Sequence, residues 1–585
     1  MKTQLLRVVL PGLTAGGLLL GCVAAPDEPS VQQALANLLD PPPPPEVPIK
    51  PQPGESAVEA RPVNQDAAKE RRVQSMAHFA TAVSHDIRRE KKKAIEEYFK
   101  AGMSNAADTG LVKRVVRYLL DNKDSHRAAL ILVKATELKD SPAELDAWLG
   151  IAYAREGKLD LAIIASEAAI RKSPDTIQAY RNLCTIYRDM KRPKNWLETI
   201  RNADQVKDPD ADFLAGLAGL YLDYSKTHPN EAKSIKSRVQ KILSAARKQN
   251  PKEPAVLLKM LAAHEVAGEF AAAAGFAESL LKLSPRNAVL RRQAAQLHMK
   301  AGRVNDSERH LKELVKLTPA DPQTNWALGL MAKDRRDYPK AAEFFARVMT
   351  LNRNFEPVYY ELASVQIMQD RARQALSTLE LARKRFKPNF MLEFWTAAAH
   401  RSLKDYAKAL AHFASAEAQA IANKEKQYLS SGFYFDLGAT QERSKRFHEA
   451  EKSFRKAIEL DPDFAGALNY LGYMWAERGE NLKEAHQMIS KAVKLDGNNA
   501  AYLDSMAWVT FQMGDAKEAL KWQLKALKAM ERDKEEDAVL YEHLGDIYHA
   551  LKDVAGARKF WKKSLAIEDN PKVKARLDKL PAAQP

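Results

Sequence analysis

Small and apolar residues recur along this chain with a period of about 34 residues, between residues 75 and 571. The pattern can be counted in repeats that begin at residues 75, 109, 143, 177, 211, 254, 288, 322, 356, 390, 431, 465, 500 and 538. Position 8 is mostly small: Ala82, Val116, Gly150, Cys184, Ala218, Leu261, Ala295, Gly329, Ala363, Ala397, Gly438, Gly472, Ala507 and Gly545. Position 20 is Ala or Ser in most repeats, with Trp196 as an exception and Ala485 one residue late.

This spacing predicts that each repeat forms two antiparallel helices. Positions 8 and 20 are expected to face each other at the closest approach, because large side chains there would push the backbones apart. Larger apolar residues at positions 7, 11, 17 and 24 would fill the layers, and proline near position 32, as at Pro174 and Pro462, would end the second helix. One pair cannot bury its own apolar face, whereas a stack can. The sequence therefore predicts an all-α solenoid of about 14 helix-turn-helix units.

Several repeats also match a known signature, W-x2-L-G-x2-Y followed by A-x3-F and P. Residues 431–464 carry Leu437, Gly438, Ala450, Phe454 and Pro462, and residues 538–571 carry Leu544, Gly545, Tyr548, Ala557 and Trp561. On these matches, residues 75–571 resemble the tetratricopeptide repeat (TPR) family. The resemblance implies a right-handed superhelix whose concave groove, lined mainly by the first helix of each repeat, binds peptides or partner proteins. It implies a binding protein, not an enzyme, and no cofactor.

The N-terminus has the pattern of a bacterial lipoprotein signal. Lys2 and Arg7 are followed by an apolar stretch too short to span a membrane comfortably, which ends in Leu19-Leu20-Gly21-Cys22. This ending resembles the lipobox, which implies cleavage after Gly21 and acylation of Cys22. Two or three acyl chains give durable anchoring where one does not. Val23 follows the cysteine where aspartate would favour the inner membrane, so we expect attachment to the outer membrane, facing the periplasm.

A proline-rich segment separates this signal from the repeats. It includes the run Pro41–Pro45, and its composition favours an extended, semi-rigid spacer over a folded core. The expected organisation is a signal peptide (1–21), a lipidated cysteine with a disordered linker (22–74), the TPR superhelix (75–571) and a C-terminal tail (572–585). The short basic tail is expected to cap the last repeat.

The chain carries a net charge of +16, or +14 without Lys2 and Arg7 of the signal. This excess favours anionic partners such as acidic protein surfaces, acidic glycans or lipid headgroups. A solvated basic surface is the favoured explanation, and nucleic acid is not expected as a partner, because the basic residues are scattered over many predicted helices and the chain is expected to be exported.

Motifs for catalysis or metal binding are absent from the sequence. His264-Glu265 begins an H-E-x-x-H motif, but residue 268 is glycine. The 13 histidines are scattered and are interpreted as solvated or core-edge residues, so neither a catalytic nor a metal site is predicted. Cys184 occupies a small position and is interpreted as a buried free thiol.

Aromatic residues recur at positions expected to face the groove. Position 5 holds Trp326, Tyr360, Phe394 and Phe435 in four successive repeats, while Tyr473, Trp508 and Phe511 occupy positions 9 or 12 further on. Such rings could anchor apolar peptides or sugar faces. The alternative is that a register slipped by one residue places them inside the stack. Two further C-terminal motifs, Leu503-Asp504-Ser505 and Glu542–Asp546, resemble closing units of repeat lipoproteins, and no role is assigned to them.

The leading functional hypothesis is a membrane-anchored scaffold for protein–protein interactions in the cell envelope, of the kind that assembles export, pilus or secretion machinery. The alternatives are a surface or periplasmic glycan-binding protein, or a regulator of an enzyme that acts on envelope glycan or peptidoglycan. A catalytic domain is not expected, because the repeats leave few residues from which to build one.

Overall fold

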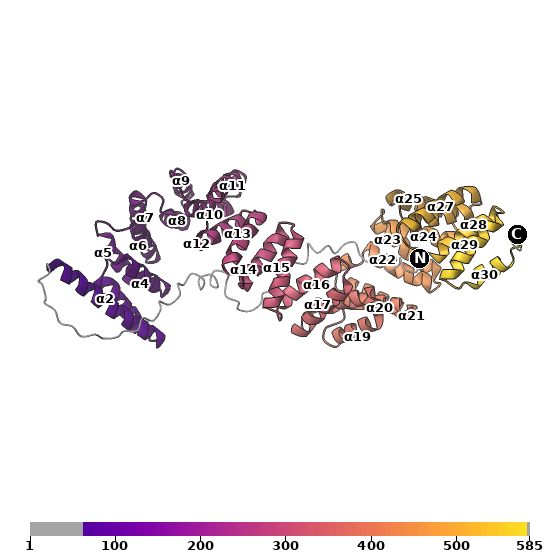
Figure 1. The fold of residues 1–585 in the computed structure, drawn as a ribbon, viewed down its shortest axis with the longest axis horizontal. Coiled ribbons are helices and arrows are strands. Elements are labelled where there is room, and N and C mark those ends of the chain that lie inside the picture. The colour runs from indigo at the N-terminus through magenta and orange to yellow at the C-terminus, as the bar shows by residue number, and fades with distance from the viewer. Residues whose placement is uncertain (1–62, 582–585) are drawn as a thin grey trace, which may run out of the picture. The chain divides into compact units, whose positions relative to one another are not determined.

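The computed structural model describes residues 63–581, and all regular structure within that range is helical (Figure 1). The signal peptide, Cys22 and the linker up to residue 62 lie outside the described residues. Between residues 63 and 581, no helix is both long enough and apolar enough to cross a bilayer. Contacts divide the described chain into two bodies, residues 63–318 and 319–581, which we treat separately.

The N-terminal body contains fourteen α-helices that pair in sequence order, α2 with α3 through α14 with α15. They are α2 (Val63–Ile87), α3 (Lys91–Ser104), α4 (Thr109–Asp121), α5 (Ser125–Thr136), α6 (Ala143–Arg155), α7 (Leu159–Lys172), α8 (Ile177–Asp189), α9 (Pro193–Ala203), α10 (Ala211–Thr227), α11 (Ala232–Lys248), α12 (Pro254–Val266), α13 (Phe270–Leu283), α14 (Ala288–Lys300) and α15 (Val304–Leu317), with a 3-10 turn, η1 (Pro229–Glu231).

The C-terminal body contains seven further pairs, α16 with α17 through α28 with α29, and a final helix. They are α16 (Pro322–Asp334), α17 (Tyr338–Leu351), α18 (Pro357–Met368), α19 (Ala372–Arg383), α20 (Phe390–Ser402), α21 (Tyr406–Ala422), α22 (Ser431–Arg443), α23 (Phe447–Leu460), α24 (Ala465–Arg478), α25 (Leu482–Leu495), α26 (Ala500–Gln512), α27 (Ala516–Arg532), α28 (Ala538–Ala550), α29 (Val554–Ile567) and α30 (Pro571–Asp578), with a second 3-10 turn, η2 (Lys426–Tyr428).

These boundaries confirm the repeat register. The first helix of twelve repeats begins at the expected residue, and α18 begins one residue later. The exception is α2, which begins at Val63 and not at residue 75. Residues 63–74 are therefore helical, and the prediction of a disordered linker is wrong for them. Unlike the proline-rich segment that precedes them, these residues contain no proline. Their only large apolar residues are Val63 and Val73.

In each helix pair except α10 with α11, the turn between the two helices contains a residue in the left-handed conformation at position 15 of the repeat. These residues have φ between 56° and 94°: Arg89, Lys123, Gly157, Lys191, Gly268, Gly302, Arg336, Asp370, Lys404, Lys445, Gly479, Gly514 and Lys552. This conformation ends a helix by turning the chain sharply, and glycine adopts it most readily. The same turn at the same position gives the pairs a common geometry.

Position 8 is small because the neighbouring helix fills the space beside it. A Cβ atom at Gly438 would lie 2.9 Å from Cδ1 of Phe454, and one at Gly472 would lie 2.7 Å from Cγ1 of Ile489 and 3.0 Å from the carbonyl oxygen of Ala485. The side chain that meets position 8 thus comes from position 24 or 25, one turn beyond the predicted partner at position 20. The position-20 residues are nevertheless fully buried, as Ala450 and Ala557 show.

The predicted tail begins with α30, which packs on the last repeat. Val573 is completely buried with Ala557 and Trp561 of α29. Arg576 donates to the carboxylates of Glu542 and Asp546 on α28. An added helix with these contacts covers the apolar face that the last repeat would otherwise expose, as solenoids require.

Candidate functional site

The four aromatic residues at position 5 do not line an exposed groove. Tyr360, Phe394 and Phe435 are 6%, 4% and 3% exposed, and Trp326 is half-buried. The ring centroids of Trp326 and Phe345, Phe394 and Phe413, and Phe435 and Phe454 lie 5.3, 6.0 and 5.9 Å apart. Position 5 therefore packs against position 24 of the same repeat. The rings therefore pack in the core although the register has not slipped, and the groove prediction is wrong for them.

The other predicted aromatic residues lie together at one place in the C-terminal body. Trp508 stacks on the imidazole of His543, with centroids 4.0 Å apart, and also on Phe511 at 5.3 Å. The ring of Tyr473 lies 6.1 Å from His543. Tyr473 and Phe511 are half-buried, so part of each residue reaches solvent. The first helices of three successive repeats, α24, α26 and α28, contribute these rings.

Two carboxylates complete this cluster. Nδ1 of His543 donates to Asp504, with its nitrogen 3.0 and 3.1 Å from the two carboxylate oxygens. Nε2 of the same ring lies 3.8 Å from Oε1 of Glu477. Gln523 of α27 donates to Asp504 and also to the carbonyl oxygen of Leu540, which ties α26 to α28. We call Tyr473, Glu477, Asp504, Trp508, Phe511 and His543 the α24–α28 cluster.

Electrostatics fix the charge state of this cluster. Burial disfavours the charged form of His543, but attraction and hydrogen bonding to Asp504 and Glu477 outweigh it and raise the pKa of His543 to about 10. Burial acts to raise the pKa of Glu477, whereas hydrogen bonding and attraction to His543 act to lower it. The effect of His543 prevails, so the pKa of Glu477 is lowered. At neutral pH the imidazole of His543 is therefore positively charged and Glu477 is a carboxylate.

This arrangement suits binding better than catalysis. A histidine that stays protonated at neutral pH is a poor general base. Glu477, by contrast, keeps 45% of its side chain exposed and interacts with the half-buried Tyr473. An exposed carboxylate next to an aromatic ring can accept a basic group while the ring covers the adjoining apolar segment.

Sequence reasoning found only part of this cluster. It selected Tyr473, Trp508 and Phe511, but left Asp504 and His543 within motifs that had no assigned role. Both residues lie on first helices, at positions 5 and 6 of adjacent repeats; position 5 is apolar in most repeats, whereas position 6 is often polar. The available signal was therefore Asp504 alone, a carboxylate at a position that is apolar in most repeats.

A second polar cluster lies in the N-terminal body and joins histidines that the sequence analysis treated as scattered. Nε2 of His298 on α14 lies 3.0 Å from Oε1 of Glu278 on α13, and Nε2 of His310 on α15 lies 3.4 Å from the same oxygen. The two histidines are 2% and 6% exposed, and their rings stack with centroids 5.3 Å apart. Among residues 63–581, this is the set whose nitrogen and carboxylate atoms lie close enough together to hold a metal ion.

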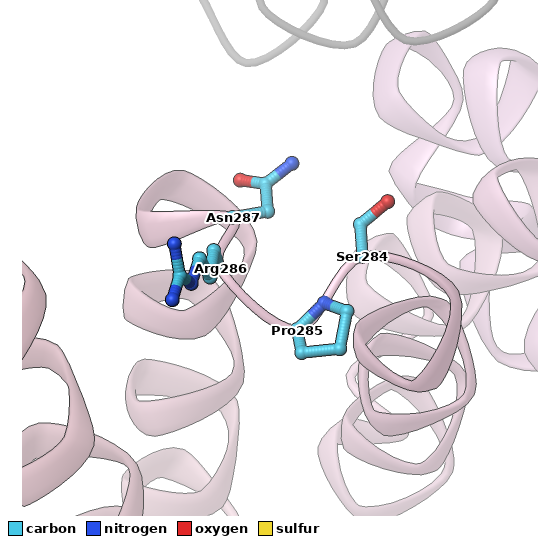
Figure 2. A pocket seen from close by; sticks show the side chains of 4 residues that line it. All are labelled: Ser284, Pro285, Arg286 and Asn287. Carbon is cyan, nitrogen blue, oxygen red and sulfur yellow. The ribbon is translucent and has the colours of Figure 1, made fainter.

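Other candidate features serve the fold. Figure 2 shows the loop between α13 and α14, where Ser284, Pro285, Arg286 and Asn287 line a surface hollow of about 580 Å³. Asn287 accepts a hydrogen bond from the backbone N–H of Leu290 and so caps α14. Cys184 is a buried free thiol, as predicted, and burial raises its pKa to about 12.

Comparisons with known proteins agree with this architecture. Family models described as tetratricopeptide repeat match residues 116–176, 266–333 and 431–464. A TPR repeat-containing protein of Pseudomonas aeruginosa is 26% identical over 202 residues, which are 34% of this chain and 33% of the relative. The match thus spans about a third of that relative's length.

Solved structures of the same kind are more distant. A tetratricopeptide repeat protein from Parabacteroides merdae is 19% identical with a TM-score of 0.35, over 44% of this chain and 97% of its own. Yeast Tom70 is 15% identical with a TM-score of 0.33, over 80% of this chain and 98% of its own.

The stacked helix pairs define an all-α solenoid, a class of protein whose members act mainly as interaction scaffolds. With the three repeat matches and the agreement of the helix boundaries, the chain belongs to the tetratricopeptide repeat family. Repeats of this family are protein–protein interaction modules and are typically non-catalytic.

Proposed function

We propose that this chain is a lipid-anchored scaffold that binds partner proteins in the bacterial cell envelope. The repeats supply the binding module, and the lipobox-like sequence ending at Cys22 supplies the anchor. Val23 after the cysteine favours the outer membrane, with the solenoid facing the periplasm. The assembly of an export, pilus or secretion machine is the role that we propose for such a scaffold.

The α24–α28 cluster is the observation that carries the binding proposal. Its aromatic residues are held in place by the buried Asp504–His543 pair, so the surface is ordered before a partner arrives. Preorganised side chains lose little entropy on binding, which favours hot spots of this kind. The exposed carboxylate of Glu477 favours a partner segment that carries a basic residue next to an apolar one, although the chain as a whole is basic.

The test is capture of partners from detergent-solubilised membranes, followed by mass spectrometry. Glu477→Gln and Phe511→Ala should each lower the yield of the specific partners at least tenfold. The matched controls are Glu459→Gln and Leu460→Ala on α23, which change an exposed acid and an exposed apolar residue outside the cluster. Equal capture by all four variants would refute the role of the cluster, and glycan enzymes among the captured proteins would favour the regulator alternative.

The anchor is tested separately by fractionation. Cys22→Ser should release the chain from membranes and abolish the acyl mass of the mature protein. Cys184→Ser is the matched control, because it removes the other cysteine, a buried one, and should leave the chain with the membrane. Membrane partitioning of the Cys22→Ser variant would contradict the anchor and leave the binding proposal standing.

A further inference from the structure

The cluster of Glu278, His298 and His310 has a counterpart elsewhere in the chain. Glu380, His400 and His412 each lie 102 residues after the corresponding member, which is three repeats of 34 residues. In both sets the histidines occupy positions 11 and 23 of one repeat, and the glutamate occupies position 25 of the repeat before it. The rings of His400 and His412 stack like those of His298 and His310, with centroids 5.5 Å apart.

The two sets differ in what their histidines contact. Nδ1 of His412 lies 2.6 Å from Oε2 of Glu393, and Arg383 donates to the other oxygen of that carboxylate. Glu380, His400 and His412 line a hollow of about 390 Å³ together with Arg383. In the second set, His412 thus contacts a carboxylate other than Glu380. In the first set, both histidines direct Nε2 at a single oxygen of Glu278.

We propose that Glu278, His298 and His310 bind one divalent transition-metal ion of the zinc class. Zn²⁺ bound tetrahedrally at about 2.0–2.2 Å from its ligands holds neighbouring ligand atoms about 3.3–3.6 Å apart. The distances of 3.0 and 3.4 Å from the histidine nitrogens to the glutamate oxygen already match that spacing to within a few tenths of an ångström. Two imidazoles and one carboxylate suit zinc and its neighbours, whereas Ca²⁺ and Mg²⁺ prefer all-oxygen sites.

The surroundings of the histidines fit the same ligand set. Nδ1 of His298 and Nδ1 of His310 are buried without a hydrogen-bond partner. When Nε2 coordinates a metal, Nδ1 carries the proton, and a nearby carboxylate commonly orients such a ring. Oδ2 of Asp306 lies 3.9 Å from Nδ1 of His298 and is placed for that role.

Three protein ligands leave one position of a tetrahedron open. Glu278 is the exposed edge of the cluster, with 37% of its side chain accessible, so the open position faces solvent on that side. Water or a side chain of a partner can fill it. Because the ligands come from α13, α14 and α15, the metal would also join one repeat to the next.

Arg309 is the competitor for the metal. Its Nη2 lies 3.0 Å from Oε1 of Glu278, and its side chain is 60% exposed, so it is free to turn toward solvent. Binding of a dication would displace it, because two positive charges cannot share one carboxylate oxygen without strong repulsion. Removal of Arg309 should therefore strengthen metal binding.

The experiment is a titration of the purified, chelator-treated full chain with ZnCl₂, followed by calorimetry and repeated with CoCl₂ for its visible spectrum. We expect one equivalent to bind, with the intense visible absorption of tetrahedral Co²⁺, and no heat from CaCl₂. Glu278→Gln and His310→Ala should weaken binding at least tenfold, whereas Arg309→Ala should tighten it. His400→Ala and His412→Ala, the matched controls 102 residues later, should change the affinity less than twofold.

Far-UV circular dichroism of each variant excludes loss of fold as the cause, and Glu278→Gln is the safest variant because its side chain is partly exposed. The proposal is overturned if no equivalent binds. It is equally overturned if Glu278→Gln binds like the parent chain, or if the control variants lose as much affinity as His310→Ala.

Discussion

Trp508 lies flat against His543, with ring centroids 4.0 Å apart and planes inclined by 14°. The imidazole is charged, because Asp504 and Glu477 hold its pKa at about 10 against the effect of burial. A cation against the face of an indole ring is attracted to it, and more strongly where water is excluded. The stack thus links the aromatic half of the α24–α28 cluster to its ionic half.

The stability of this region should depend on the charge of His543. Because its folded-state pKa is raised from 6.5 to about 10, its contribution is fully present below pH 6.5, declines as the pH rises, and is lost above pH 10. The melting temperature of the parent chain should therefore exceed that of His543→Gln most clearly at pH 6. The difference should shrink steadily toward pH 10. A gap independent of pH in that window would show that the imidazole is neutral.

Substitution of a position-8 glycine should destabilise the stack. Gly438→Ala places a methyl group 2.9 Å from the ring of Phe454, and such overpacking costs about 1–3 kcal/mol. Gly275→Ala is the matched control, since no atom lies within 4 Å of its added methyl group and alanine favours a helix by about 0.5–1 kcal/mol. Thermal unfolding should shift down for the first variant and slightly up for the second. Equal shifts would invalidate the packing register.

The fold was predictable because its geometric demands recur in the sequence. A small residue at position 8 is required wherever position 24 or 25 fills the same space, so the spacing of Gly438 and Gly472 reports the helix pairing directly. The turn at position 15 is only partly visible in the sequence, because lysine or arginine adopts the left-handed conformation there more often than glycine, as Lys404 and Lys552 do. The conformation of these turns is therefore set by the helices on either side of them and not by the residue at position 15.

The candidate sites were less predictable because they depend on pairs distant in sequence. Asp504 and His543 are 39 residues apart, and Glu278 and His310 are 32 residues apart. Period and composition say which face of a helix is buried, but not which polar side chains meet there. The position-5 rings show the converse error: Phe394 and Phe435 were assigned to the groove because they recur, whereas recurrence is equally typical of core positions.

The thiol of Cys184 should be inert in the folded protein. Burial raises its pKa to about 12, so the reactive thiolate is scarce at neutral pH, and the side chain is 4% exposed. In Cys22→Ser, which leaves Cys184 as the remaining cysteine, a thiol reagent at pH 8 should label the native protein at least a hundredfold more slowly than the urea-unfolded one. Comparable rates would mean that the α8–α9 pair opens readily.

The last helix should protect the repeat that it covers. Arg576 bridges Glu542 and Asp546, and the Asp546 carboxyl group also accepts a hydrogen bond from Nε1 of Trp561 at 3.0 Å. Arg576→Ala would leave Asp546 without its cation in a buried setting, and an unsatisfied buried group of this kind costs about 1–3 kcal/mol. Because repeats are stabilised by their neighbours, the loss should be local and raise hydrogen exchange in α28 and α29 above that in α22 and α23.

The pH dependence of that loss has a definite sign. Burial already raises the pKa of Asp546, and Arg576 acts against this rise. Without the guanidinium, the pKa of Asp546 should rise further. Asp546 of the variant should therefore become protonated as the pH falls from 7 to 5, which removes the buried unpaired charge. The excess hydrogen exchange in α28 and α29 should then diminish. Lys574→Ala removes an exposed positive charge from the same helix and is the matched control, with exchange like that of the parent chain. Identical exchange in the two variants would show that the Arg576 bridge contributes nothing to the cap.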